Sequence, residues 1–226
     1  PYHGFDMPET VHVYNTLAKK KEVFEPLKAG KVSLYSCGPT VYDYAHIGNF
    51  RSFLMADLLT RVLNYAGYKV EKVQNITDVG HLTNDDLADS SGEDKIGKKA
   101  KASGQSAQEV ADFYAGKFIE DEAVLRIQEP DHRPKATEYI DEQIAMTAQL
   151  IKRGFAYEVD GSVYFRVEKF NQYGKLSGNT LENLNAGSRI DVNDDKETAH
   201  DFALWKKAEP QHLMQWDSPW GRGFPG

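Results

Sequence analysis

The sequence predicts an α/β protein in which a parallel, doubly wound sheet is followed by a smaller α+β piece. Three observations predict it. A strand, a loop, a helix and a second strand follow one another between residues 33 and 76. The pair Asp160-Gly161, which is typical of a tight turn, indicates a hairpin further along the chain. The 226 residues, 40% of them hydrophobic and 12% aromatic, suffice for one large domain or two small ones with a buried core.

The first strand is predicted over "SLYSC" at 33–37, where apolar and polar residues alternate between two glycines. Apolar residues then recur at helical spacing at Phe50, Phe53, Leu54, Leu58, Val62 and Tyr65. Gly67 provides a C-terminal stop for this helix, and residues 68–76 read as the second strand. A strand–helix–strand crossover is almost always right-handed with parallel strands, which favours a doubly wound sheet.

The middle of the chain predicts a loop and then a helix. Residues 83–104 are polar and dotted with glycine, so we expect a loop. "SAQE" at 106–109 forms a capping box in which Ser106 caps the helix and Glu109 reaches back. The helix that follows has its apolar face at Val110, Phe113, Tyr114, Phe118 and Leu125, and "EPDHRP" interrupts the chain at 129–134.

The last third predicts one helix and one hairpin. The helix runs to about Arg153, with apolar residues at Ile140, Ile144 and Ile151 and a stop at Gly154. A hairpin is expected over 155–167, because Asp160-Gly161 favours a type I′ turn. The rest, from Glu168, reads as loop-rich, with no regular element in the final "WDSPWGRGFPG". We place a boundary near residue 130.

Composition narrows the function classes. No apolar run approaches the length of a membrane span, and the first residues, which read as a tag remnant or a frayed end, lack the plan of a signal peptide. One cysteine fits a reducing compartment, so we expect a cytoplasmic protein. A net charge of −7 argues against broad nucleic-acid coating. The four lysines of "DKIGKKAK" at 94–101 fit a solvated segment better than a local nucleic-acid patch.

A constellation of polar residues follows the first predicted strand. Cys37 stands at the carboxyl end of that strand, the edge where open α/β sheets bind ligands. His46, Gly48 and Asn49 stand at the start of the first helix, whose free N–H groups attract phosphate. Taken singly, such a cysteine is most often a small buried hydrophobe and such a histidine a cap or a surface residue. Taken together, they predict a nucleotide-phosphate site.

"YSCGPTVYDYAHIGNFRSF" at 35–53 closely resembles the signature of cysteinyl-tRNA synthetases, class I enzymes with a Rossmann-like catalytic domain. Further segments resemble the same family in the same order: "YNTLAKKKEVFEP" at 14–26, "NITDVGH" at 75–81, "DHRPKATEYI" at 131–140, "DFALWK" at 201–206 and "SPWGRGFPG" at 218–226. The resemblance covers nearly all of the chain after residue 12. It implies a Rossmann-like catalytic half over 12–130 and an α+β connective insertion over 131–226.

The resemblance implies an activity and two of its site residues. In this family, the carboxylate of L-cysteine attacks the α-phosphate of ATP, with magnesium as the usual companion ion, and the resulting cysteinyl-adenylate transfers cysteine to tRNA(Cys). His46 matches the first histidine of the family's His-Ile-Gly-His motif and Gly48 its glycine, so both would bind ATP. Asn49 stands where a second histidine is common. Asparagine keeps a hydrogen-bond donor there, so we expect its catalytic role to be weakened or shared.

The resemblance also implies how the amino acid is chosen. Cys37 matches the family's first zinc ligand, and Gly38 and Thr77 match positions that line the cysteine pocket. A zinc–thiolate bond separates cysteine from serine far better than an apolar pocket does. The family's other zinc ligands, its Lys-Met-Ser-Lys-Ser loop and its anticodon-binding region follow the segment that ends at Gly226. We therefore expect a fragment that binds zinc weakly or not at all and has little activity alone.

Two other readings remain open. Cysteine ligases of mycothiol biosynthesis share the fold and the adenylate chemistry but join cysteine to an amino sugar; the segments at 75–81 and 131–140 favour the synthetase. A truncated synthetase can also persist as a non-catalytic module that binds ATP or a partner. Small nucleotidyltransferases carry a similar histidine motif but lack the cysteine at this spacing.

Overall fold

The computed structural model describes residues 10–80, 95–178, 196–210 and 212–226. Residues 1–9, nearly all of the suggested frayed end, and residues 83–94, the first part of the predicted loop, lie outside the described residues. The chain divides into two compact units. The first unit combines residues up to 39 with 44–76 and 116–134, and the second combines 40–43, 77–115 and 135–226.

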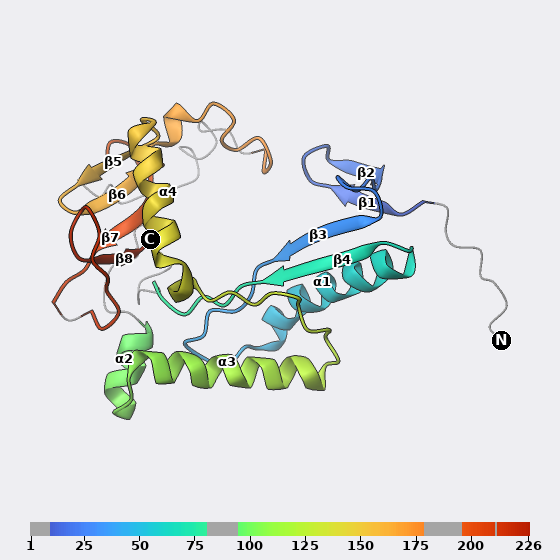
Figure 1. The fold of residues 1–226 in the computed structure, drawn as a ribbon, viewed down its shortest axis with the longest axis horizontal. Helices are drawn as coiled ribbons and strands as arrows, with labels where there is room; N and C mark the ends of the chain where they lie inside the picture. Colours follow the sequence, from blue (N-terminus) through green and yellow to red (C-terminus); the bar gives the residue numbers. More distant parts are fainter. Residues whose placement is uncertain (1–9, 81–94, 179–195, 211) are drawn as a thin grey trace. The chain divides into compact units, whose positions relative to one another are not determined.

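The first unit contains the predicted βαβ crossover. Strand β3 (Lys31–Ser36) is followed by helix α1 (Ile47–Tyr65) and strand β4 (Lys69–Gln74), and the two strands pair in parallel from Lys31↔Lys69 to Ser36↔Gln74. This confirms the parallel pairing. Helix α1 runs back along the strands, so its N-terminus lies at their carboxyl edge (Figure 1). Gly67, with φ of +87°, follows the helix end as predicted.

A hairpin that the sequence did not predict precedes this crossover. Strands β1 (His12–Asn15) and β2 (Lys20–Val23) pair antiparallel across a turn in which Lys19 has a φ of +55°. A second addition lies beyond β4. Residues of the segment 131–134 continue the sheet, because His132 forms a parallel bridge with Val73 and the N–H of Ile76 donates to the carbonyl of Pro134 at 2.8 Å.

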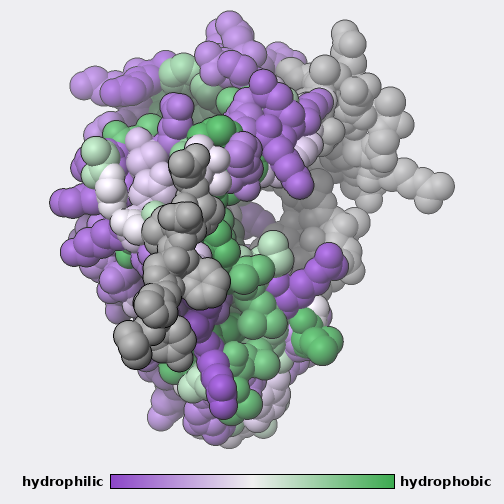
Figure 2. Space-filling model, turned by 90° about the vertical axis from the view of Figure 1, so that its right-hand side faces the viewer, coloured by the Kyte–Doolittle hydropathy of each residue, from purple (hydrophilic) through white to green (hydrophobic). Residues whose placement is uncertain are grey.

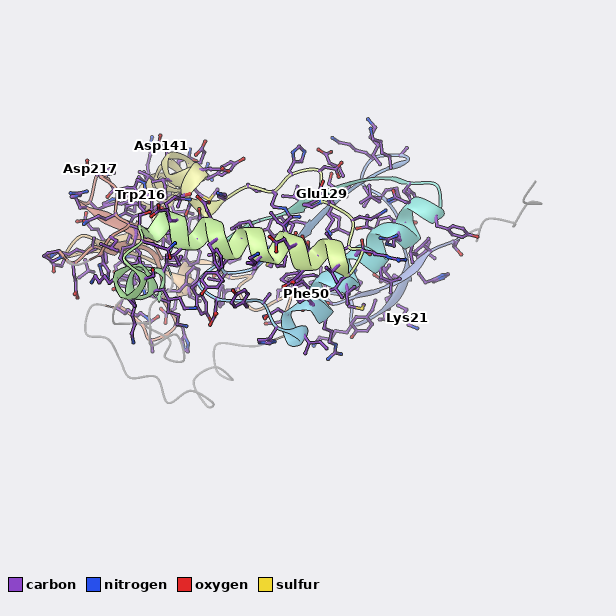
Figure 3. All side chains as sticks on the ribbon, turned by 90° about the horizontal axis from the view of Figure 1, so that it is seen from below. Lys21, Phe50, Glu129, Asp141, Trp216 and Asp217 are labelled. Carbon is purple, nitrogen blue, oxygen red and sulfur yellow. The ribbon has the colours of Figure 1, made fainter. Side chains whose placement is uncertain are left out.

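Aromatic rings join α1 to helix α3 (Ala107–Val124) inside the first unit. The ring of Phe50 stacks on that of Phe118 with a centroid distance of 5.7 Å, and Phe53 meets Phe118 edge-on at 5.0 Å. Figure 3 labels Phe50 where α1 begins beside α3. Burial against α3 therefore fixes the start of α1, the part of the helix that carries the predicted site.

The remaining apolar stripe predicted on α1 is not core. Leu54, Leu58, Val62 and Tyr65 lie within α1, as their spacing predicts, but they are 41–59% exposed. The buried residues of α1 are instead Phe50, Phe53, Asp57, Thr60 and Leu63. Of these four, Leu54 and Leu58 line an apolar groove of about 600 Å³ with the end of α3, and Figure 2 shows exposed apolar surface in green.

The second unit corrects the predicted loop at 83–104. Residues 95–103 form a helix, α2 (Lys95–Ser103), so that part of the prediction was wrong. Burial of Ile96 and Ala100 stabilises it. Two of its lysines pack on aromatic rings, with Lys95 4.8 Å above Tyr42 and Lys99 4.5 Å above Tyr114. The lysine run is therefore partly held by neighbouring rings.

The capping box that begins α3 is confirmed. The hydroxyl of Ser106 accepts the N–H of Glu109 at 3.2 Å, and the carboxylate of Glu109 accepts the N–H of Ser106 at 2.7 Å. The predicted apolar face is only half confirmed, because Val110 and Phe118 are buried whereas Phe113 and Leu125 are 46% and 41% exposed.

The second unit also holds a four-stranded antiparallel sheet in the order β5-β6-β7-β8. A 3₁₀ turn, η1 (Ala136–Tyr139), leads into helix α4 (Ile140–Lys152), and the predicted hairpin is β5 (Ala156–Val159) and β6 (Ser162–Phe165). Positive φ at both Asp160 and Gly161 confirms the type I′ turn. A short 3₁₀ turn, η2 (Val167–Lys169), follows β6.

The expectation that the final "WDSPWGRGFPG" has no regular element was wrong, and the loop-rich stretch before it also contains a strand. Strand β7 (Phe202–Lys207) pairs with β6, and β8 (Gly223–Pro225), inside the final glycine-rich stretch, pairs with β7. Position 223 of β8 requires glycine, because a Cβ there would lie 2.2 Å from the indole nitrogen of buried Trp205. Among the described helices, none has the length and apolarity that crossing a bilayer requires.

Candidate functional site

The candidate site lies at the carboxyl edge of the β3–β4 pair. Cys37 follows the last residue of β3, Asn75 follows the last residue of β4, and His46 precedes α1. Parallel strands end at the same edge, and the N-terminus of the crossover helix lies there too (Figure 1). The first unit thus places a thiol, a carboxamide and an imidazole at one edge of its sheet.

His46 is the N-cap of α1. Its backbone is extended, with φ of −107° and ψ of 172°, and its Nδ1 accepts the N–H of Gly48 at 3.0 Å. A neutral imidazole with an accepting Nδ1 carries its proton on Nε2. Nε2 is therefore the nitrogen of His46 that can donate to a ligand. The sequence alone allowed donation from either nitrogen, and the cap removes that ambiguity.

Gly48 and Asn49 complete the cap. A Cβ on Gly48 would lie 2.8 Å from Cε1 of His46, so the glycine makes room for the imidazole ring. Asn49 Oδ1 accepts the N–H of His46 at 3.0 Å, which forms a reciprocal capping box. The amide oxygen of Asn49 is thus used within the helix start, and its Nδ2 is the group suited to donate outward. His46, Gly48 and Asn49 are all exposed, and the first turn of α1 contains no acidic residue.

The loop after β3 is tied to the end of β4. The N–H of Gly38 donates to Oδ1 of Asn75 at 2.9 Å, and the hydroxyl of Tyr35 donates to the same oxygen at 2.9 Å. A Cβ on Gly38 would lie 1.6 Å from the carbonyl oxygen of Asn75, so only glycine allows the two backbones to approach this closely. Cys37 is an exposed free thiol, which differs from the small buried hydrophobe that a lone cysteine at a strand end most often is.

Thr77 belongs to the second unit. Its carbonyl accepts the N–H of Val41 at 3.1 Å, and it forms a parallel bridge with Thr40. The structure therefore brings His46, Gly48 and Asn49 together at the start of α1 and places Cys37 and Gly38 on one loop of the same unit, while Thr77 stands in the other unit.

Sequence reasoning missed Asn75 and Tyr35. Asn75 begins the quoted "NITDVGH" segment directly after the second strand, a position from which a short carboxamide can reach the neighbouring loop. Partial desolvation of its hydroxyl raises the pKa of Tyr35, so this hydroxyl stays protonated and donates. In the described part of the chain, no three His, Cys, Asp or Glu side chains are grouped closely enough to hold a metal ion.

Comparisons with known proteins place this geometry in context. The model of a family described as "tRNA synthetases class I (C) catalytic domain" matches residues 23–226. A cysteine--tRNA ligase of Chlorobium chlorochromatii is 51% identical over 215 residues, which is 95% of this chain and 44% of the relative. A cysteine--tRNA ligase of Thermus thermophilus is 50% identical over 214 residues, with the same two shares.

The chain therefore spans less than half the length of these curated relatives. A solved structure described as an arginyl tRNA synthetase from Campylobacter jejuni aligns with a TM-score of 0.43 and 15% identity, over 65% of this chain and 40% of that one. A likeness at that level supports no conclusion here.

Proposed function

Because the chain belongs to the family of class I (C) tRNA synthetase catalytic domains, we propose that it forms the ATP-binding and cysteine-binding half of a cysteine--tRNA ligase. The observation that carries the proposal is the reciprocal cap of His46 and Asn49 at the carboxyl edge of a parallel strand pair. This cap presents donors at the position where α/β folds receive phosphate.

We propose that ATP binds at the start of α1. Nε2 of His46 and Nδ2 of Asn49 would donate to its phosphate oxygens, and the N-terminal end of the helix dipole would favour their negative charge. The carboxylate of cysteine then attacks the α-phosphorus, the bond to the bridging oxygen breaks, and pyrophosphate leaves. The donors stabilise charge that grows on the phosphates during this step, which accounts for a catalytic role of His46 and Asn49.

We propose that cysteine binds beside the loop of Cys37 and Gly38, and separately that Thr77 contacts the cysteine substrate. The close approach of Gly38 to Asn75 gives this loop a fixed position, which supports a specificity role. The proposal includes tRNA(Cys) as the acceptor in the second step. It also divides the chain into a catalytic half over 12–130 and a connective insertion over 131–226, and it places the reaction in the cytoplasm.

Zinc requires more ligands than the described residues offer. A zinc site uses three or four protein ligands, and Cys37 is the one cysteine of the sequence. Since no metal-holding group occurs among the described residues, they do not fit zinc by themselves, and we assign no step to a metal. We propose that Cys37 contributes one ligand and that the 226-residue chain alone binds Zn²⁺ weakly, which equilibrium dialysis would measure.

ATP–pyrophosphate exchange tests the proposed activity on the protein that carries this chain. We expect exchange that depends on cysteine and is not supported by serine. Exchange without any amino-acid dependence, or with serine equal to cysteine, contradicts the proposal.

The molecule that accepts cysteine distinguishes the synthetase from the second candidate, an amino-sugar ligase. Transfer of radiolabelled cysteine to tRNA supports the synthetase, and transfer to an amino sugar with no charging of tRNA supports the ligase. Tight binding of a cysteinyl-sulfamoyl-adenosine analogue without any turnover would support the third candidate, a non-catalytic binding module.

A further inference from the structure

One carboxamide oxygen joins the ends of the two parallel strands. Oδ1 of Asn75 accepts both the Gly38 N–H and the Tyr35 hydroxyl, each at 2.9 Å. The two donors belong to β3 and the loop after it, while the acceptor is the residue directly after β4. All three residues lie in the first unit. This arrangement crosses from one strand to the next just where the regular backbone ladder ends, at the Ser36↔Gln74 pair.

Two donors on one oxygen determine which way the amide faces. An amide nitrogen in that position would face the Gly38 N–H, which can only donate, so the oxygen must point toward Gly38. Desolvation raises the pKa of Tyr35, which keeps its hydroxyl protonated and able to donate to Oδ1. Asn75 therefore holds a single orientation, and that orientation sets the backbone of the residue that follows Cys37.

The fit of Gly38 against Asn75 adds a steric constraint to the hydrogen bond. The backbone of Gly38 lies so near the Asn75 carbonyl that a Cβ would overlap it at 1.6 Å. The hydrogen bond to Asn75 Oδ1 and the close contact with the Asn75 carbonyl together leave this loop little freedom to shift. Loops that select a ligand need this kind of support.

We infer that Asn75 is a positioning residue for the Cys37–Gly38 loop and that Tyr35 orients its carboxamide. The inference rests on the proposed function, because it takes that loop as the receptor of the cysteine substrate. Asn75 acts through Gly38 and needs no contact with the substrate. Its loss should therefore weaken binding of the amino acid and leave ATP binding at the start of α1 unchanged.

Hydrogen exchange at the Gly38 amide tests the positioning directly. Because the chain has one cysteine, labelling of cysteine carbonyls with ¹³C and of glycine amides with ¹⁵N isolates the Gly38 signal in the 226-residue protein. We expect Asn75→Leu, which removes the acceptor, to lower protection of this amide about tenfold. Asn75→Asp keeps oxygen acceptors at the same reach, so protection should be retained. Unchanged protection in Asn75→Leu overturns the inference.

Tyr35→Phe is a second variant for the case in which Asn75→Leu fails to fold. Tyr35 is 63% exposed, so loss of its hydroxyl removes one hydrogen bond without opening a cavity. We expect Gly38 protection to fall about twofold to threefold as the amide gains freedom to turn. Protection equal to that of the parent would count against the orienting role.

Steady-state ATP–pyrophosphate exchange kinetics on the protein that carries this chain test the functional consequence. We expect Asn75→Leu to raise KM for cysteine about tenfold, with KM for ATP within about twofold of the parent, and Asn75→Asp to restore the cysteine value. An equal rise in both KM values overturns the positioning role. If the parent shows no cysteine-dependent exchange, the proposed function fails, while the Gly38 protection data still decide whether Asn75 positions the loop.

Discussion

Asn49 Oδ1 holds the backbone N–H of His46 at 3.0 Å, so the third residue of α1 fixes the residue that caps the helix. The two side chains thereby combine a structural task with the proposed binding task. One atom of each is used inside the helix start, and the other polar atom of each is the one proposed to donate to ATP. Substitutions that keep the capping atom and remove the proposed ATP donor can therefore separate helix capping from ATP binding.

Asn49→Asp and Asn49→Ala form such a pair. Aspartate keeps the oxygen that caps His46 and adds a negative charge favoured at a helix N-terminus, so stability should be equal or higher. Alanine removes the cap and should lower the free energy of unfolding by about 1 kcal/mol in urea titrations. Aspartate also replaces the Nδ2 donor proposed to bind ATP with a negative charge that repels its phosphates. We expect at least about a tenfold rise in KM for ATP, and an unchanged KM would show that Asn49 does not contact ATP.

His46→Asn tests the outward nitrogen of the imidazole. Asparagine is among the best N-cap residues, so it replaces the acceptor that Nδ1 offers to Gly48, and unfolding should shift by less than about 0.5 kcal/mol. It does not reproduce the Nε2 donor. We expect kcat for ATP–pyrophosphate exchange to fall about 10²–10³-fold, the usual loss for one donor to developing charge. Full activity in a stable His46→Asn protein would assign the histidine a capping role alone.

Local signals predicted the parts of the fold that short-range chemistry determines. The capping box at Ser106 and Glu109 and the type I′ turn at Asp160-Gly161 depend on neighbouring residues only, and the structure confirms them. β8 could not be predicted in the same way. Its three residues become a strand because β7 offers an edge and because Gly223 allows Trp205 to pack against it.

The same distinction applies to the candidate site. The histidine motif is continuous in the sequence and was found there, whereas the link from Gly38 to Asn75 spans 37 positions. The sequence shows a glycine in a loop and an asparagine after a strand, and only the parallel pairing of β3 with β4 brings the two together. Residues that support a site through another element have no spacing rule by which the sequence could reveal them.

Gly38→Ala should be strongly destabilising. Its Cβ would overlap the Asn75 carbonyl oxygen at 1.6 Å, and a backbone atom of a paired strand end cannot move aside cheaply. We expect a loss of about 3 kcal/mol or more in the free energy of unfolding. Gly116→Ala is the matched control: it lies within α3 with no atom in 4 Å of the added methyl, so alanine should stabilise by about 0.5–1 kcal/mol. Equal effects of the two substitutions would contradict the close approach.

Replacing the buried Lys72 should raise the stability of the protein by an amount that depends on pH. This lysine of β4 is 2% exposed, and its Nζ lacks a hydrogen-bond partner among the described residues. Burial lowers the pKa of its ammonium group, although the charges of Glu122 and Asp57 oppose the shift. The folded state thus binds this proton less tightly than the unfolded chain. The penalty is complete below the folded pKa and fades as the pH rises toward the unfolded value of about 10.4.

Lys72→Met should therefore raise the free energy of unfolding by about 1 kcal/mol at pH 7, with a difference from the parent that shrinks toward pH 10. Glu122 keeps its ion pair with Arg133 at 2.8 Å, so the substitution does not leave that carboxylate unpaired. Lys69→Met, at an exposed position of the same strand, should change stability by less than about 0.5 kcal/mol at either pH. A destabilised Lys72→Met protein at pH 7 would mean that attraction to Glu122 and Asp57 outweighs the cost of burying the charge.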